Sequence, residues 1–149
     1  MIDNINWYPG HMKKTRELIQ ENLKMVDLVI EVIDARIPVS SRNPIIDELV
    51  KSKQRIIILN KSDLSDRTEN EKWAEVLRKD GSIVLQMNCM TGQGVNQLFK
   101  TLNRLQEEKN QGQIRKKPLR MMIVGVPNVG KSSLINRMTG KKSAKTGDR

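Results

Sequence analysis

A glycine-rich segment followed by lysine and serine is the clearest chemical feature of this 149-residue sequence. Residues 125–133 read Gly-Val-Pro-Asn-Val-Gly-Lys-Ser-Ser, which fits the pattern G-x-x-x-x-G-K-[ST] of a phosphate-binding loop. The two glycines let backbone N–H groups turn toward phosphate oxygens, and the helix beginning near Lys131 adds the positive end of its dipole. The alternative is a glycine-rich turn that only precedes a helix.

The side chains of this loop have separate predicted tasks. Lys131 reaches the β- and γ-phosphates as a point charge, and we predict a part for it in catalysis. The Ser132 hydroxyl is the predicted ligand of Mg²⁺, and Ser133 can donate to the α-phosphate. The other nucleotide-binding positions predicted in the loop are Asn128, Val129 and Gly130.

An Asn-Lys-Ser-Asp segment at 60–63 is suited to a guanine base. The Asp63 carboxylate can accept from both N1–H and the N2 amino group of guanine, a pair of donors that adenine lacks. Asn60 can reach N7 and brace the phosphate loop, the stem of Lys61 can cover the ring, and Ser62 completes the predicted set. By itself the segment is also compatible with a helix N-cap turn in which Asp63 or Ser65 is the cap.

A third turn, at 88–94, reads Asn-Cys-Met-Thr-Gly-Gln-Gly. In GTPases the corresponding turn usually reads Ser-Ala-x-x-Gly-x-Gly and contacts guanine O6 through a backbone N–H. Asn88 and Cys89 replace Ser and Ala here, and we predict that both line the nucleotide. Cys89 has two interpretations, a small buried filler or a reactive thiol.

The elements that must position these turns alternate between strand and helix. Short apolar runs at 28–33, 55–59, 82–87 and 119–124 predict buried strands. Helical spacing predicts helices near 11–25, 45–50, 69–79, 95–105 and 131–138. Such alternation predicts an α/β fold, a parallel sheet in a three-layer α/β/α sandwich, with ligands bound beyond the carboxyl ends of the strands.

The order of the motifs along the chain is informative. The phosphate loop comes first in Ras-like GTPases, whereas here it follows the Asn-Lys-x-Asp segment. A circular permutation explains this order, and a parallel sheet tolerates it because surface termini often lie close together. We predict one circularly permuted GTPase domain over residues 1–149, with the basic connector 110–118 joining the two parts.

Three local signatures resemble the circularly permuted ribosome biogenesis GTPase A group, also called YlqF-type. They lie at 7–12 (Trp-Tyr-Pro-Gly-His-Met), 34–44 (Asp-Ala-Arg-Ile-Pro-Val-Ser-Ser-Arg-Asn-Pro) and 125–133. The resemblance implies a P-loop GTPase fold and a bacterial, cytoplasmic, monomeric protein that binds GTP or GDP with Mg²⁺. It also implies a large-subunit (50S) ribosomal precursor and its rRNA as partners, with neither DNA nor an integral membrane contact.

The resemblance further implies a catalytic role for His11. Members of the group carry a hydrophobic residue where Ras-like proteins use glutamine to orient water, and the histidine of this segment is the proposed substitute. An imidazole can orient or deprotonate the attacking water. The alternative is a loop histidine with a satisfied hydrogen bond.

The sequence departs from the group in one respect. No D-x-x-G segment follows the phosphate loop, so we expect a C-terminally truncated fragment that lacks the last strands and hydrolyses GTP weakly or not at all. The strand at 119–124 should then present an open apolar edge.

Composition and charge narrow the function classes. One cysteine and one histidine exclude an intrachain disulfide and nearly exclude structural zinc, and the N-terminus shows no secretory signal. The net charge of +10 arises entirely within residues 109–149, which hold 11 Lys and Arg and only Asp148 as an acid. This excess favours a polyanionic partner, although a solvated linker is the alternative.

A non-hydrolysing RNA- or ribosome-binding module is therefore a second hypothesis. A third, an ATP-using protein, is disfavoured by Asp63.

Overall fold

The computed structural model describes residues 2–6, 12–36, 44–79, 81–125 and 130–140. Strands and helices alternate along the chain through almost the whole of these ranges. The elements are β1 (Ile2–Asn6), α1 (Met12–Leu23), β2 (Leu28–Asp34), α2 (Pro44–Val50), β3 (Gln54–Asn60), the 3-10 turn η2 (Ser62–Leu64), α3 (Arg67–Arg78), β4 (Ile83–Met87), α4 (Val95–Asn110), β5 (Met121–Gly125) and α5 (Lys131–Thr139).

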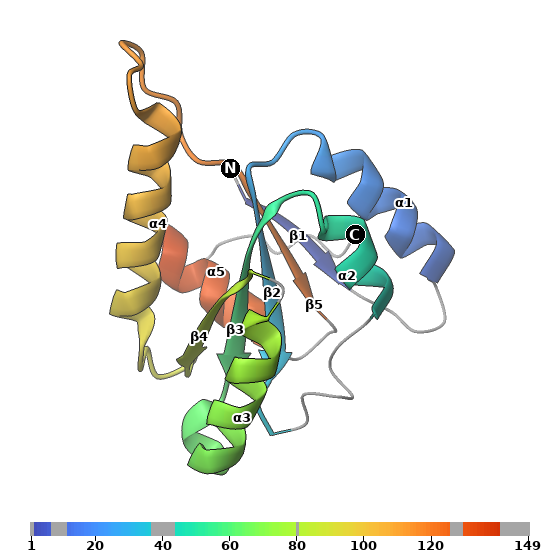
Figure 1. Cartoon of the computed structure of the whole chain (residues 1–149), viewed down its shortest axis with the longest axis vertical. Helices are drawn as coiled ribbons and strands as arrows, with labels where there is room; N and C mark the ends of the chain where they lie inside the picture. The colour runs from blue at the N-terminus through green and yellow to red at the C-terminus, as the bar shows by residue number, and fades with distance from the viewer. Residues whose placement is uncertain (1, 7–11, 37–43, 80, 126–129, 141–149) are drawn as a thin grey trace.

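The strands form one parallel sheet in the order β1-β5-β2-β3-β4 (Figure 1). This arrangement confirms the predicted α/β fold class. The predicted open edge beside 119–124 is wrong, because β1 pairs with β5 from Ile2↔Met121 to Asn6↔Gly125. Sequence reasoning missed β1 because its five residues, Ile-Asp-Asn-Ile-Asn, hold only two apolar side chains. What makes the segment a strand is its partner more than one hundred positions away along the chain.

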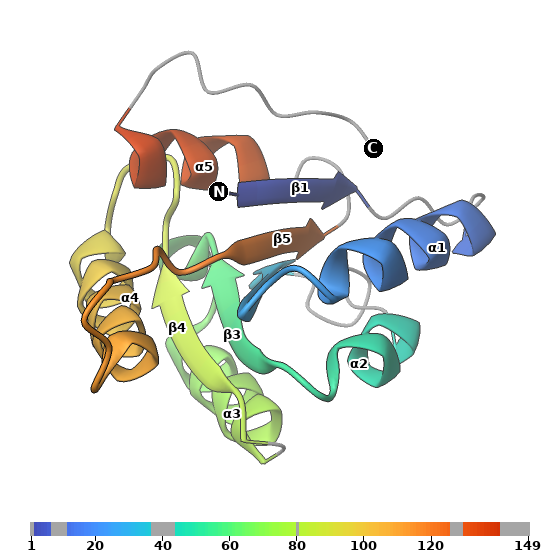
Figure 2. The same cartoon turned by 90° about the horizontal axis from the view of Figure 1, so that it is seen from above.

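Helices cover both faces of the sheet (Figure 2). On one face, α4 and α5 pack Leu98, Leu105 and Leu134 against alternate strand residues such as Ile30 and Ile56. On the other face, α1 and α2 cover β2 and β5, while α3 covers β3 and β4. Every residue of β2 is buried, as expected for a strand with helices on both sides. Among the described residues, none of the helices has both the length and the apolar character that crossing a membrane requires.

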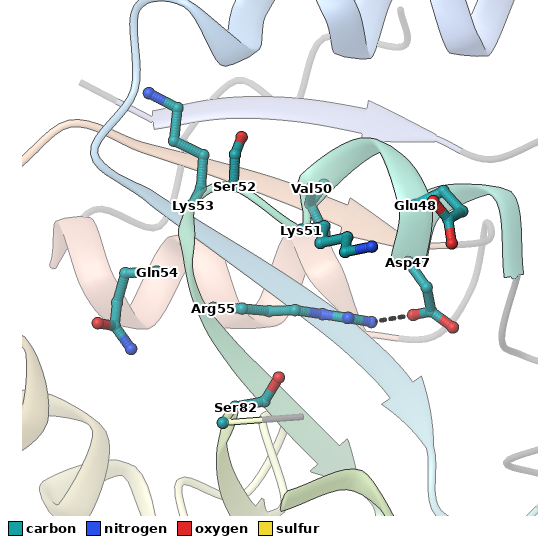
Figure 3. A pocket seen from close by; sticks show the side chains of 10 residues that line it. Asp47, Glu48, Val50, Lys51, Ser52, Lys53, Gln54, Arg55 and Ser82 are labelled. Carbon is teal, nitrogen blue, oxygen red and sulfur yellow. Dashed lines mark hydrogen bonds and ion pairs between the residues drawn. The ribbon is translucent and has the colours of Figure 1, made fainter. Parts of the chain in front are cut away.

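A buried ion cluster joins β2, β3 and α2. Arg55 of β3 pairs with Glu31 of β2 and with Asp47 of α2, and Glu31 is only 1% exposed. Burial lowers the pKa of Arg55, but the two carboxylates outweigh it, so the net shift is upward. The cluster borders a hollow of 560 Å³ between α2 and the start of β4 (Figure 3). A buried pair of this kind tolerates loss of one partner poorly, because the other charge stays buried and uncompensated.

The carboxyl ends of the strands are aligned by the sheet register. Asp34 at the end of β2 lies opposite Asn60 at the end of β3, and Asn60 lies opposite Met87 at the end of β4. Gly125 ends β5 at the same edge. Residues that follow these positions therefore meet at one rim of the sheet, which is where parallel α/β proteins bind ligands.

Candidate functional site

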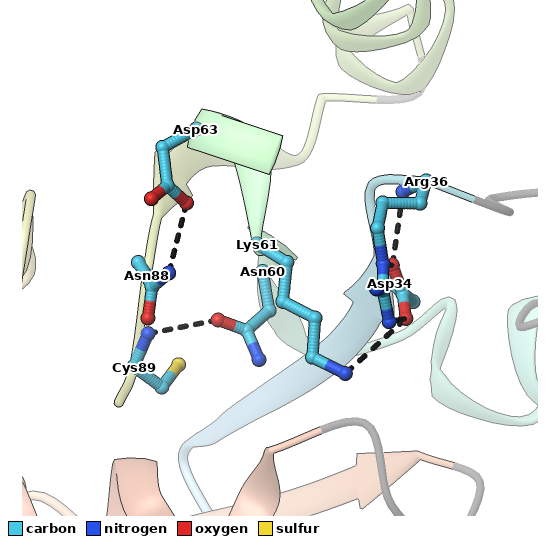
Figure 4. A network of polar contacts seen from close by, with 7 residues as sticks. All are labelled: Asp34, Arg36, Asn60, Lys61, Asp63, Asn88 and Cys89. Atoms are coloured by element: carbon cyan, nitrogen blue, oxygen red, sulfur yellow. Dashed lines mark hydrogen bonds and ion pairs between the residues drawn. The ribbon is translucent and has the colours of Figure 1, made fainter. Parts of the chain in front are cut away.

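Asn60 connects the three turns that sequence analysis singled out. Its side-chain Oδ1 accepts a hydrogen bond from the backbone N–H of Cys89, at 2.8 Å, in the turn after β4 (Figure 4). Its Nδ2 lies so close to the phosphate loop that a Cβ added to Gly130 would be 2.1 Å from it. Asn60 is 2% exposed, so it is enclosed by both turns. The structure thus brings residues near 60, 89 and 130 together at one rim.

Asp63 lies beside the turn after β4 and is exposed. One of its carboxylate oxygens accepts from Nδ2 of Asn88 at 2.8 Å (Figure 4). The alternative role of Asp63 or Ser65 as a helix cap does not hold, because the cap of α3 is Asp66, whose side chain accepts from Glu69 N–H. The Asp63 carboxylate therefore has an open side and a fixed donor on the other, an arrangement that suits recognition of paired N–H donors.

The phosphate-loop end of the site begins α5. Gly130 has φ +102°, a backbone region that favours glycine, and no side chain caps the helix N-terminus. The uncapped N–H groups and the helix dipole together suit an anion such as a phosphate. Lys131 is 4% exposed, and its ammonium donates to the Gly125 carbonyl at 3.0 Å, across the loop. Ser132 is exposed and Ser133 partly so.

Four of the predicted functional residues are not fully placed. His11, Asn128 and Val129 lie outside the described residues, and Ser62 is described only through its backbone. Their roles remain predictions from the sequence.

Asp34 and Arg36 join the site although sequence reasoning gave them no task. The Asp34 carboxylate accepts from the Arg36 backbone N–H at 2.9 Å and from its Nε and Nη2 at 3.2 and 3.0 Å. Lys61 turns toward the same carboxylate, with Nζ 3.5 Å from Oδ2, and has φ +62° (Figure 4). Burial raises the pKa of Asp34, but the Arg36 hydrogen bonds outweigh it and the net shift is downward. The Asp34 carboxylate of the Asp-Ala-Arg signature therefore pairs with both Arg36 and Lys61. In the sequence, the only signal for this role of Asp34 was its position at the end of a predicted strand.

We predict that Asp34→Asn weakens GDP binding about five-fold, because Lys61 loses the carboxylate that holds its side chain in place at the rim. Titration calorimetry with GDP measures this loss. Asp27→Asn is the matched control, since Asp27 also has a lowered pKa but pairs with Lys109 at the start of β2. Both variants should unfold more easily. A Lys61 role in binding is refuted if the two bind GDP equally well.

Cys89 fits the buried-filler interpretation. Its side chain is 0% exposed, and burial raises the pKa of the thiol to about 12, with Arg137 opposing the shift. The thiol is therefore overwhelmingly protonated at pH 8. We predict no modification by iodoacetamide in the native protein at pH 8 and full modification in denaturant, read by mass spectrometry. Rapid native modification would support the reactive-thiol interpretation.

Comparison with known proteins finds similar GTPases. A family model described as a 50S ribosome-binding GTPase matches residues 120–149. Ribosome biogenesis GTPase A of Bacillus licheniformis is 46% identical over 97% of this chain and 53% of its own length. Mitochondrial ribosome-associated GTPase 1 of Mus musculus is 44% identical over 91% of this chain and 42% of its own length. A crystal structure of GNP-bound YlqF from T. maritima aligns with a TM-score of 0.63 at 32% identity, covering 87% of this chain and 49% of that one.

The similarity runs through almost all of the sequence, while the chain spans about half the length of the curated relatives it matches. The order of its turns is permuted relative to Ras-like GTPases. Strand β3, which leads into the Asn-Lys-x-Asp segment, comes before β5, which leads into the phosphate loop, and both strands lie in the same sheet. The chain is therefore similar, over almost its whole length, to the ribosome biogenesis GTPase A, or YlqF-type, proteins, and its motifs stand in the order of a circularly permuted GTPase.

Proposed function

We propose that this chain binds guanine nucleotides at the rim where Asn60, Asp63, Cys89 and Gly130 meet. The observation that carries the proposal is the position of Asn60, which is bonded to the turn after β4 and lies against the phosphate loop. One nucleotide can therefore span both ends of the site, with its base at Asp63 and its phosphates at Lys131. The predicted contacts of Lys61, Ser62, Asn88, Asn128, Val129 and Ser133 complete the proposal.

The protein to which this chain corresponds is proposed to hydrolyse GTP to GDP and phosphate. Its phosphate end suits a Mg²⁺-bound triphosphate, because the uncapped start of α5 attracts anions and Ser132 is exposed beside it. Ser132 would hold Mg²⁺, which neutralises charge on the β- and γ-phosphates. Lys131 would stabilise the same oxygens, and His11 is the proposed group that orients water.

The proposed partner is a precursor of the large ribosomal subunit, contacted through its rRNA by a bacterial, cytoplasmic, monomeric protein. A basic loop between α4 and β5 supports this partner. Its exposed side chains include Arg115, Lys116, Lys117 and a fully exposed Ile114. Asn110 pins the loop at its base, accepting from Lys117 N–H at 2.7 Å and donating to Lys117 O at 2.8 Å.

This basic loop projects beyond α4, away from the carboxyl edge of the sheet (Figure 1). Phosphate contacts by Lys and Arg dominate the affinity of proteins for nucleic acids. A pinned loop also loses less conformational entropy when it binds. The same loop favours the second candidate function, a non-hydrolysing RNA-binding module.

The central experiment is calorimetric titration with GDP, a non-hydrolysable GTP analogue and ATP, each with and without Mg²⁺. We expect both guanine nucleotides to bind and ATP to compete poorly, with Mg²⁺ strengthening the GTP analogue. ATP competing as well as GTP would refute the guanine assignment.

RNA binding separates the two candidate functions. A ribosome-assembly GTPase should change its affinity for precursor particles between the GDP and GTP-analogue states. A simple RNA-binding module should ignore the nucleotide, while its RNA affinity falls steeply with salt.

A further inference from the structure

Arg137 of α5 grips the turn that follows β4. Its Nε donates to the Cys89 carbonyl at 2.8 Å, and its Nη2 donates to the Met90 carbonyl at 2.5 Å. The guanidinium fork thus spans two successive carbonyls, a geometry that lysine cannot reproduce. Space is reserved for it, because a Cβ on Gly92 would lie 2.7 Å from Nη1.

The N–H groups in the same two peptide planes bind a different partner, the side chain of Asn88. The Cys89 carbonyl shares a plane with Met90 N–H, and the Met90 carbonyl shares one with Thr91 N–H. Both N–H groups donate to the side-chain Oδ1 of Asn88, each at 3.0 Å. By holding the carbonyls, Arg137 therefore also aims the two N–H groups that orient the Asn88 amide.

The orientation of the Asn88 amide in turn fixes the position of the Asp63 carboxylate, the group proposed to bind the base. With Oδ1 engaged by two donors, its Nδ2 faces Asp63 and donates to Oδ1 of that carboxylate at 2.8 Å. Asn88 is 6% exposed, so it has little freedom to turn away. The contacts form one chain from the arginine through two peptide planes and Asn88 to Asp63.

We propose that Arg137 is a positioning residue for guanine selectivity, acting on Asp63 through the 88–91 turn and Asn88. The inference rests on the proposed function and adds a connection to it. Arg137 lies on the helix that the phosphate loop begins, six positions after Lys131. A nine-residue helix is stiff, so the phosphate end and the base end of the site are mechanically joined through this side chain.

The test compares GDP with inosine diphosphate, which lacks only the N2 amino group that Asp63 would read. We expect the unmodified chain to prefer GDP about 30-fold, as for a lost hydrogen bond to a charged group. Arg137→Ala should reduce that preference about five-fold, mainly by weakening GDP. The GDP preference of Arg137→Lys should lie between those of the unmodified chain and Arg137→Ala, because lysine keeps the charge but cannot contact both carbonyls.

A double-mutant cycle tests the route. Asn88→Ala should lower the GDP preference as much as Arg137→Ala does, and the double variant should lower it no further. Arg104→Ala is the matched control, an exposed arginine of α4 that should leave the preference unchanged. Equal losses for GDP and inosine diphosphate in Arg137→Ala, or additive losses in the cycle, would overturn the proposal.

Hydrogen exchange gives a readout that needs no nucleotide. Amide protection at Met90 and Thr91 should fall in Arg137→Ala while circular dichroism shows the fold intact. Unchanged protection would contradict the proposed grip. A wild-type chain that bound neither nucleotide would refute the proposed function itself, and this inference with it, whereas normal GDP selectivity in Arg137→Ala refutes the inference alone.

Discussion

Replacing Asp63 with asparagine is expected to turn the site from guanine toward xanthine nucleotides. A carboxylate accepts from both N1–H and the N2 amino group of guanine, whereas an amide offers one acceptor and one donor. That pair matches N1–H and O2 of xanthine. Guanine keeps only a neutral hydrogen bond from N1–H, and the asparagine amino group then faces the N2 amino group, donor against donor. This change costs about 3 kcal/mol, so GDP affinity should fall about 150-fold while affinity for xanthosine diphosphate rises.

Calorimetry or displacement of a fluorescent nucleotide measures the two affinities. Asp66→Asn is the matched control, because Asp66 is exposed nearby and caps α3, a position where asparagine serves equally well. The control should bind GDP normally and unfold at nearly the same temperature. Unchanged GDP affinity in Asp63→Asn would mean that the base lies elsewhere.

Gly130→Ala is expected to abolish measurable nucleotide binding. The new Cβ would lie 2.1 Å from Nδ2 of Asn60, and φ at this position is +102°. Asn60 would have to move, and with it would go its hydrogen bond to Cys89 N–H. Because one methyl group disturbs both the phosphate loop and the base turn, we expect at least about a 100-fold loss of GDP affinity, or more than about 3 kcal/mol.

Gly140→Ala at the other end of the same helix separates the collision from backbone strain. Gly140 also has a positive φ, +66°, but a Cβ there meets nothing within 4 Å. Both variants should lower the melting temperature, and only Gly130→Ala should lose GDP binding in calorimetry. If the two variants bound GDP alike, the close approach of Asn60 would not matter to the site.

The sequence alone determined the fold class, and it supplied the chemistry that is proposed for the site. The phosphate loop and the Asn-Lys-x-Asp segment are short patterns whose residue types carry their own mechanism. The strands β2 to β5 and the helices were visible in local hydrophobic spacing, because burial on two faces selects continuous apolar strands and amphipathic helices. The circular permutation was also visible, because it is a change in the order of motifs along the chain.

The tertiary structure decided which groups meet. Strand β1 exists because β5 is beside it, Lys61 turns to Asp34, and Arg137 reaches carbonyls 47 and 48 positions earlier. Local hydrophobic spacing does not predict such contacts, since they depend on sheet order and register across distant segments. A sequence pattern can therefore place Asp63 at a strand end, but only the packed fold shows which side chains hold its carboxylate in place.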